Sequence, residues 1–392
     1  MQAKSQKIRL LFIVTALHKD GALLSTLTTL KHLDKRYFEP RLFVLKQLKS
    51  SEQGTSWKLL LQDVNVVFGE EQGLKSRGAS VKLFKRLYHC ARHSDIIIGG
   101  LEMAPTFLAV IAGKLLGKPS VGFIRNSLPD LFLGLPASHK ILTRTIYPYL
   151  TRAIAISNGI KAGTERLIPG LKGRISTVYI PIDIERISEM GSLPLSAGSD
   201  DRPYILGVGR LMPQKGFDIL LHAYALAREQ GLQHRLVIVG EGRERLKLES
   251  LIKDLQLSEH VLLAGFQENP YSWMKGAELF VSSSRFEGFC RVLAEAQALG
   301  TPVVSTDCPD GPAEVLQNGE SGILVGNENA DALAAGIISL INDKTKMQEF
   351  SVKGIERVEE FTFRNTIGSF EKILMEIYQS RYKSKGRLMQ SV

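Results

Sequence analysis

Four charged residues in the second half of the chain have types and spacings suited to a ligand that carries phosphates and hydroxyls. Arg210 and Lys215 lie five positions apart in the loop GRLMPQKGFD, which follows the apolar run PYILGVG. Arginine offers a planar fork of donors and lysine a compact charge, so together they could neutralise a diphosphate. The alternative is that both are solvated surface cations. Glu287 and Glu295 stand eight positions apart in FEGFCRVLAEAQALG, where Gly288 would allow a ligand to approach closely.

The residues around Glu287 predict a strand that ends near Ser284, then a turn, then a helix that begins at about Cys290. The backbone amides of Phe289, Cys290 and Arg291 would be free at the start of this helix. Free amides at a helix start bind anions, and the helix dipole strengthens the attraction. This turn is therefore predicted to meet an anionic ligand.

Glu295 is predicted to lie about two turns inside the same apolar, Ala-rich helix. A buried carboxylate without a partner is costly, so it needs hydrogen-bond donors. The diol of a ribose supplies two donors, which suggests a nucleotide sugar with Glu295 on the ribose and Glu287 on the sugar. The alternative is that a structural arginine or lysine neutralises Glu295.

Two other nucleotide-binding signatures do not occur in the sequence. The segment GVGRLM has Met212, and the segment GEGRER has Arg245, where a dinucleotide fingerprint requires its third glycine. A GxxxxGK[ST] phosphate loop is also absent. These departures disfavour an NAD-dependent dehydrogenase.

Short apolar runs alternate with helix-length segments along the whole chain, which is typical of parallel α/β sheets. Strands are predicted at 9–17, 40–46, 64–68, 94–100, 119–124, 152–157 and 175–182, and in a second series at 203–209, 234–240, 260–266, 278–284, 301–307 and 322–326. The predicted parts are an N-terminal Rossmann-like domain at 1–190, a linker at 191–202, a C-terminal Rossmann-like domain at 203–370, and a C-terminal helix with a basic tail at 371–392.

Several separated motifs together resemble a known family. VGRLMPQKGFDIL, VGEG and SRFEGFCRVLAEAQALGTPVVSTDCPDGPAEVLQNGESGILV resemble the C-terminal domain of glycosyltransferase family 4, over roughly 200–330. The resemblance implies the GT-B fold, in which two Rossmann-like domains face each other across a cleft. It also implies a retaining, metal-independent transferase without a cofactor. The segment STDCPDGPAEVL is similar to bacterial surface-polysaccharide and lipopolysaccharide enzymes, which implies a UDP-hexose or UDP-N-acetylhexosamine donor.

The resemblance also implies roles for individual residues. Arg210 and Lys215 would hold the donor diphosphate, and with Glu287 they are the expected catalytic residues. Glu287 and Glu295 would be the family's E-x7-E pair, and Gly265 and Phe266 would lie near the base. The expected donor-binding residues are Gly21, Gly209, Arg210, Lys215, Gly265, Phe266, Glu287, Gly288, Phe289, Cys290, Arg291 and Glu295.

The N-terminal half departs from the family at two places. Its first loop, ALHKDGALLS, holds the single Gly21 where paired glycines are usual, and Arg125 and Asn126 stand where many members have a histidine. The candidate acceptor residues are His18, Glu102, Arg125 and Asn126. These departures keep open a catalytically weak subunit of a membrane-associated synthase complex. A GT-B nucleotide-sugar epimerase is another alternative, although the E-x7-E context argues against it.

The N-terminal half is strongly basic. Residues 1–190 carry a net charge of +14 and residues 191–392 a net charge of −4. Such asymmetry favours an anionic partner. Candidate membrane-surface segments are SVKLFKRLYHCARH (80–93), whose apolar stripe could equally pack on the sheet, the segment at 130–150, and the tail at 381–387. A merely solvated basic face is the alternative, and the absence of a recognition motif argues against nucleic acid.

The remaining features suggest a location. The apolar stretch LLFIVTAL near the N-terminus precedes HKDG rather than a small-residue cleavage site, so we expect a first strand and not a signal peptide. The three cysteines, Cys90, Cys290 and Cys308, have no metal-ligand spacing. We expect a cytoplasmic protein with reduced thiols, peripheral on the inner face of the plasma membrane, where a glycan or lipid-linked acceptor would be found.

Overall fold

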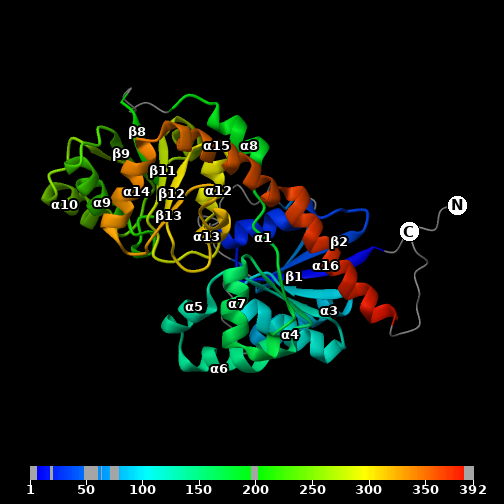
Figure 1. The fold of residues 1–392 in the computed structure, drawn as a ribbon. Helices are drawn as coiled ribbons and strands as arrows, with labels where there is room; N and C mark the ends of the chain where they lie inside the picture. The colour runs from blue at the N-terminus through cyan, green and yellow to red at the C-terminus, as the bar shows by residue number, and fades with distance from the viewer. Residues whose placement is uncertain are drawn as a thin grey trace. The chain divides into compact units, whose positions relative to one another are not determined.

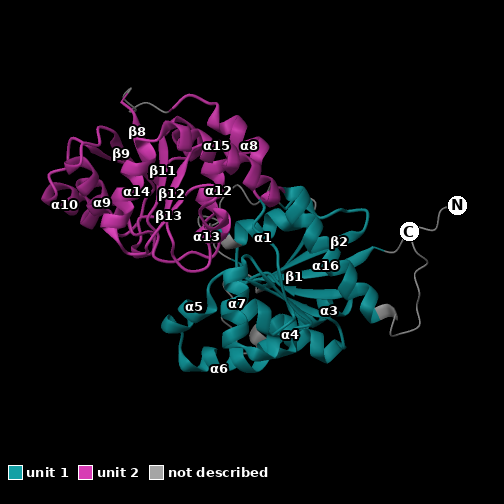
Figure 2. Cartoon of the chain, viewed as in Figure 1, with its two compact units in different colours: residues 1–181, 363–392 teal, residues 182–362 magenta. Residues whose placement is uncertain are grey.

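The computed structural model describes residues 7–17, 21–47, 61–62, 64–70, 79–195 and 202–383 (Figure 1). The chain forms two compact units (Figure 2). Unit 1 comprises residues 1–181 together with 363–392, and unit 2 comprises residues 182–362. Each unit is built on its own parallel sheet with helices on both faces, as the alternation of strands and helices predicts.

The described strands of unit 1 form one parallel sheet of seven strands in the order β3-β2-β1-β4-β5-β6-β7. The strands are β1 (Ile8–Val14), β2 (Phe38–Lys46), β3 (Asn65–Glu70), β4 (Ile96–Gly99), β5 (Ser120–Ile124), β6 (Arg152–Ala155) and β7 (Ile175–Thr177). The order reverses between β1 and β4. Ligands of doubly wound sheets bind beyond the carboxyl ends of the strands at such a switch point.

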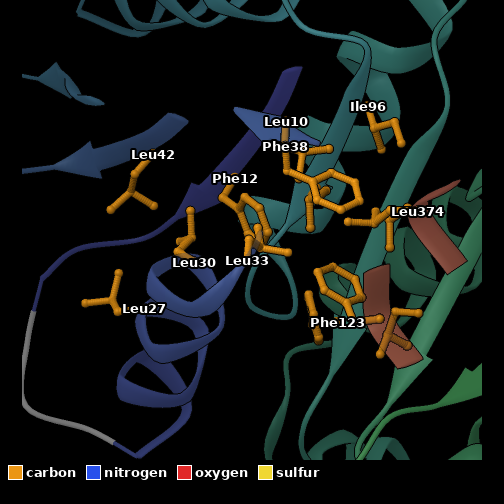
Figure 3. Close-up of a cluster of buried hydrophobic side chains, with 14 of the residues drawn as sticks. Leu10, Phe12, Leu27, Leu30, Leu33, Phe38, Leu42, Ile96, Phe123 and Leu374 are labelled. Carbon is orange, nitrogen blue, oxygen red and sulfur yellow. The ribbon is translucent and has the colours of Figure 1, made fainter. Parts of the chain in front are cut away.

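The central strand β1 is buried on both faces, so its side chains alternate between two cores. Leu10 and Phe12 point to the face covered by α1 and α16, where they lie in one buried cluster (Figure 3). Leu11 and Ile13 join the opposite cluster with residues of α3 and α4. The apolar run at the N-terminus is therefore a core strand, as the sequence analysis predicts.

Helices cover both faces of this sheet. They are α1 (Gly21–His32), α3 (Ala79–Arg92), α4 (Ala104–Leu116), α5 (Leu128–Gly134), α6 (Ala137–Ile146), α7 (Asn158–Leu167) and α16 (Phe363–Lys383), with the short 3-10 turns η2 (Tyr147–Tyr149) and η3 (Pro169–Leu171). None of the helices in the described ranges is both long and apolar enough to cross a bilayer.

Unit 2 has a parallel sheet of six described strands in the order β10-β9-β8-β11-β12-β13. The strands are β8 (Tyr204–Val208), β9 (Arg235–Val239), β10 (Val261–Gly265), β11 (Leu279–Ser282), β12 (Val303–Thr306) and β13 (Ile323–Val325). The helical segments are α8 (Ile184–Gly191), η4 (Pro213–Lys215), α9 (Phe217–Glu229), α10 (Arg245–Asp254), α11 (Pro270–Gly276), α12 (Arg291–Ala298), α13 (Pro312–Val315), η5 (Gln317–Gly319), α14 (Ala330–Ile341), α15 (Lys344–Val358) and η6 (Glu359–Phe361). The order reverses between β8 and β11, which places the switch point of this unit beside both.

The unit boundaries differ from those predicted at 190, 203 and 370. Helix α8 belongs to unit 2, where Asn269 Nδ2 donates to Met190 O at 2.8 Å. Helix α16 returns to unit 1, where the ring of Phe370 lies 5.2 Å from that of Phe123. The residues of a helix show that it has an apolar face, but not which of two similar sheets that face will cover.

The first and last residues of unit 2 lie side by side. Ile182 N donates to Phe361 O at 2.7 Å, and Ile182 and Thr362 form a parallel bridge. Both connections between the units therefore leave unit 2 at one place.

We expect that Phe370→Ala will destabilise unit 1, because the ring is 1% exposed and packs against Phe12 and Phe123. Removing a buried phenylalanine side chain typically costs about 3–5 kcal/mol. Urea unfolding followed by circular dichroism measures the change, and Ile355→Ala, at an exposed position of α15, is the matched control. Equal unfolding midpoints for the two variants would contradict the packing of α16 on unit 1.

Candidate functional site

The loops after β8 and β11 are fastened to each other at the switch point of unit 2. Ser283 Oγ donates to Lys215 O at 3.0 Å, and Arg285 N donates to Gln214 O at 2.8 Å. Gln214 Nε2 also donates to Phe286 O at 3.0 Å. These bonds bring the two sequence motifs that contain the predicted cations and the first glutamate into one site.

Gly216 makes this close approach possible. Its φ is +59°, in the left-handed region, and a Cβ there would lie 2.1 Å from Ser283 O. No other residue fits that position without moving the backbone.

Lys215 and Glu287 form an ion pair at the centre of the site. Lys215 Nζ lies 2.5 Å from Glu287 Oε1, and the side chains are 16% and 10% exposed. Ser284 Oγ also donates to Glu287 Oε1, at 2.8 Å. Burial alone would lower the pKa of Lys215, but the charge of Glu287, its hydrogen bond to the lysine and the nearby Cys290 together outweigh burial, and the pKa is raised. The lysine is therefore held as a cation, and the glutamate is its principal partner.

Arg210 is exposed at the same loop and makes no ion pair with any residue in the described ranges. Its positive charge acts to lower the pKa of Lys215. The stem of Lys215 lies over Gly209, where a Cβ would be 3.3 Å from three of its carbon atoms. Lys215 is thus paired with Glu287 and Arg210 is exposed, and the contact of both with a diphosphate stays a prediction.

Helix α12 begins at Arg291, immediately after a strained residue. Cys290 has φ 58° and ψ 59°, the left-handed conformation that non-glycine residues seldom adopt. Burial raises the pKa of its thiol to about 12, so the thiol is inert. Gly311 packs against this turn, because a Cβ on it would lie 2.9 Å from the carbonyl carbon of Phe289. Within the described chain, the amides of Cys290 and Arg291 donate to no protein acceptor, as predicted for a helix start.

Glu295 has an internal partner. Its Oε1 lies 2.8 Å from Arg291 Nε and accepts a 3.3 Å hydrogen bond from Tyr271 Oη. The Arg291 contact is an ion pair without good hydrogen-bond alignment. Burial, with the nearby Glu295 charge, raises the pKa of Tyr271 to about 12. Arg291 thus neutralises Glu295, as the second of the two alternatives from the sequence proposed. The contact of Glu295 with a ribose stays a prediction.

The glycines after β9 and β10 allow their loops to meet that of β8. Gly240 N donates to Gly265 O at 2.8 Å, and a Cβ on Gly240 would lie only 1.8 Å from Gly209 O. The ring of Phe266, next in sequence, is 71% exposed. Gly265 and Phe266 therefore lie at the edge of the same group of loops, and the ring is accessible to a ligand.

A supporting network escaped the sequence analysis. Arg285 makes two hydrogen bonds to the carboxylate of Asp218, at 2.7 and 2.9 Å, and one to Glu328 at 2.8 Å. Burial would raise the pKa of Asp218, but the bonds from Arg285 lower it. Because Arg285 also donates to Pro213 O, it fixes the turn that carries Glu287. Arg285 and Glu287, two positions apart in SRFEG, were a weak signal, since nothing near them in sequence identifies Asp218 as a partner.

The structure brings together three of the four candidate acceptor residues in unit 1. Glu102 Oε1 accepts from the backbone amides of Arg125 and Asn126, at 2.5 and 2.8 Å, and from the side chain of Asn126 at 3.2 Å. Glu102 therefore shapes the loop after β5. Gly21 starts α1 and is exposed, with open space where its Cβ would be, whereas His18 lies outside the described residues.

The side chain of Arg125 is almost fully buried at the carboxyl ends of β4 and β5. Its guanidinium donates to Ser25 Oγ and Thr26 Oγ1, both at 2.9 Å, and lies 4.6 Å from the centre of the Phe123 ring. It thus holds α1 against β5, and its contact with an acceptor stays a prediction.

Comparison with known proteins identifies the second unit. Residues 196–357 match the family described as glycosyl transferases group 1. The match covers most of unit 2 and less than half of the whole chain. It contains all of the unit 2 site described above, from Gly209 to Glu328.

Two relatives carry informative names. A Campylobacter jejuni N-acetylgalactosamine-N,N'-diacetylbacillosaminyl-diphospho-undecaprenol 4-alpha-N-acetylgalactosaminyltransferase is 32% identical over 246 residues, which are 62% of this chain and 63% of the relative. A Rhizobium meliloti lipopolysaccharide core biosynthesis glycosyltransferase is 31% identical over 196 residues, 48% of this chain and 56% of the relative. The chain thus spans less than two thirds of the length of either.

The whole fold also has solved counterparts. The crystal structure of Anabaena HepE in complex with UDP superposes with a TM-score of 0.80 at 21% identity, over 94% of this chain and all of that one. With the two parallel sheets, this similarity establishes the GT-B fold of two Rossmann-like domains.

We expect the Lys215–Glu287 pair to be strongly coupled. Glu287→Gln leaves a buried cation without its partner and should lower the free energy of unfolding by about 3–5 kcal/mol. The double variant Lys215→Met with Glu287→Gln should lower it by less than Glu287→Gln alone. Urea unfolding of the two single variants and the double variant measures the coupling. Glu349→Gln, which breaks the exposed pair with Lys353, is the control and should leave the midpoint unchanged. Additive effects of the two changes would contradict the buried pair.

Proposed function

We propose that this protein is a retaining hexosyltransferase of the family 4 type. It moves a hexose or N-acetylhexosamine from a nucleoside-diphosphate sugar, with UDP as the expected nucleotide, to a glycan or lipid-linked acceptor of a cell-surface polysaccharide. The observation that carries the proposal is the buried Lys215–Glu287 pair at the switch point of a unit that matches the glycosyl transferases group 1 family. The names of its relatives and the UDP complex of its structural counterpart support the choice of donor and acceptor.

The site has the charges that departure of a diphosphate requires. The bond between the anomeric carbon and the leaving oxygen breaks, and negative charge develops on the diphosphate. Lys215, Arg210 and the free amides at the start of α12 stabilise that charge electrostatically. Because these groups are fixed before the reaction, little reorganisation is needed when the charge appears.

Glu287 contributes in two ways. It keeps Lys215 charged and in place, and its carboxylate accepts hydrogen bonds from hydroxyls of the transferred sugar. The acceptor hydroxyl forms the new bond on the face from which the diphosphate leaves, and its proton passes to a leaving-group oxygen. This route retains the anomeric configuration and needs no protein base.

Unit 1 supplies the acceptor side of the proposal. Its basic character fits an acceptor presented at an anionic membrane, on which the enzyme would be peripheral at the inner face. The loop that Glu102 organises, with Asn126 at its surface, is the proposed contact for the acceptor.

We expect Lys215→Ala to slow transfer by about 10- to 150-fold, since a charged hydrogen bond contributes roughly 1.5–3 kcal/mol. The assay follows nucleotide release from the sugar donor that most stabilises the protein in a thermal-shift screen of UDP and GDP sugars. Lys353→Ala, at an exposed position far along the sequence, should keep the normal rate. A normal rate in Lys215→Ala would overturn the assignment.

We also expect transfer to continue in EDTA. The side-chain cations and amides, rather than a metal ion, are proposed to balance the diphosphate charge, so the rate should change less than about twofold, a barrier change well under 1 kcal/mol. Loss of activity that added Mg²⁺ restores would refute this part of the mechanism.

A further inference from the structure

Helix α6 exposes its apolar residues instead of burying them. A surface helix normally packs an apolar stripe on the core, but the single buried residue of α6 is Thr143. Ile141 is 60% exposed, and Leu142 is exposed as well. Leu133, at the end of α5 and four residues before α6, is 83% exposed. Much of the surface of these apolar side chains is therefore exposed.

Helix α4 extends the same surface. It packs against α6 and η2, and its outward residues Ile111 and Leu115 are exposed one helical turn apart. Lys114 lies between them, with Nζ 4.5 Å from the centre of the exposed Tyr149 ring. We name the residues Ile111, Lys114, Leu115, Leu133, Lys140, Ile141, Leu142, Arg144 and Tyr149 the α4–α6 face. Figure 2 shows the helices α4, α5 and α6 that carry most of them.

The charge of this part of the chain is one-sided. From 103 to 164 the sequence holds seven lysines and arginines and one acidic residue, Asp130. Lys140 and Arg144 lie one turn apart on α6, beside the exposed Ile141. Apolar side chains flanked by cations are typical of a surface that enters the headgroup region of an anionic bilayer.

Helix α3, which the sequence suggested for this role, is less suited. Leu87 and Ala91 of its apolar stripe are fully buried and pack with Cys90 in the core between α3, α4 and the sheet. Val81 and Tyr88 remain exposed. The sheet-packing alternative thus holds for half of the stripe, which leaves too few apolar side chains for independent docking.

We infer that the α4–α6 face docks on an anionic phospholipid surface, with Ile141, Leu142 and Leu133 among the acyl chains and Lys140 and Arg144 at the phosphates. The inference rests on the proposed function only in placing the acceptor at a membrane. The α4–α6 face is then the surface that holds the enzyme at the membrane. Two copies of this basic face would repel each other, which disfavours a second copy as the partner.

Vesicle sedimentation tests the inference without any sugar donor. The wild-type protein should bind vesicles that contain phosphatidylglycerol and should bind pure phosphatidylcholine much less. Lys140→Gln with Arg144→Gln should weaken binding about 30-fold at low salt, since each cation near an anionic surface contributes roughly 1 kcal/mol. Leu133→Ser with Ile141→Ser should weaken binding at low and at high salt alike.

Matched controls use exposed residues of unit 2. Val352→Ser with Ile355→Ser, and separately Lys353→Gln, should bind vesicles like the wild type. Normal binding by the α4–α6 variants, or loss of binding in Val81→Ser with Tyr88→Ser instead, would overturn the inference. A dimer in solution that the α4–α6 variants abolish would overturn it too, by making the face a contact between copies.

The outcome is separable from that of the proposed function. Vesicle binding by a protein that releases no nucleotide from any donor would leave the docking surface intact and refute the transferase. Nucleotide release by a protein that does not bind anionic vesicles would support the transferase and refute the docking surface.

Discussion

The buried ion pair between Lys215 and Glu287 is the interaction on which the rest of the unit 2 site depends. Each charge would be costly at that depth alone, so the two loops that carry them must stay together. Gly216, the Ser283 and Arg285 hydrogen bonds and the Asp218–Arg285–Glu328 network all serve that requirement. The pair thus couples the sequence motif after β8 to the motif after β11.

Much of the fold could be predicted because its signals are local. Each predicted strand corresponds to a strand of the described structure, since an apolar run between helical segments needs only its own residues to be recognised. The grouping of Gly209, Lys215, Glu287 and the start of α12 also followed, because parallel strands bring their carboxyl ends to one edge.

What the sequence could not give depends on contacts between distant residues. Nothing in the residues of α16 says that it packs on Phe12 and Phe123, about 250 to 360 positions earlier in the chain. The sequence favoured a ribose as the partner of Glu295, with a structural arginine or lysine as the alternative, and only the structure shows that Arg291 pairs with it. Glu102 and Arg125 were chosen as acceptor contacts from their places after strands, and the sequence did not show that both also hold unit 1 together.

The adjacency of Ile182 and Phe361 has a consequence for the architecture of the gene product. Unit 2 is an insertion within unit 1, and its two ends are hydrogen-bonded neighbours. Such a segment can be excised with its termini already joined in space, because no long gap has to be bridged. Unit 2 could therefore be moved between scaffolds as one module, whereas unit 1 is completed only after the whole of unit 2 has been synthesised.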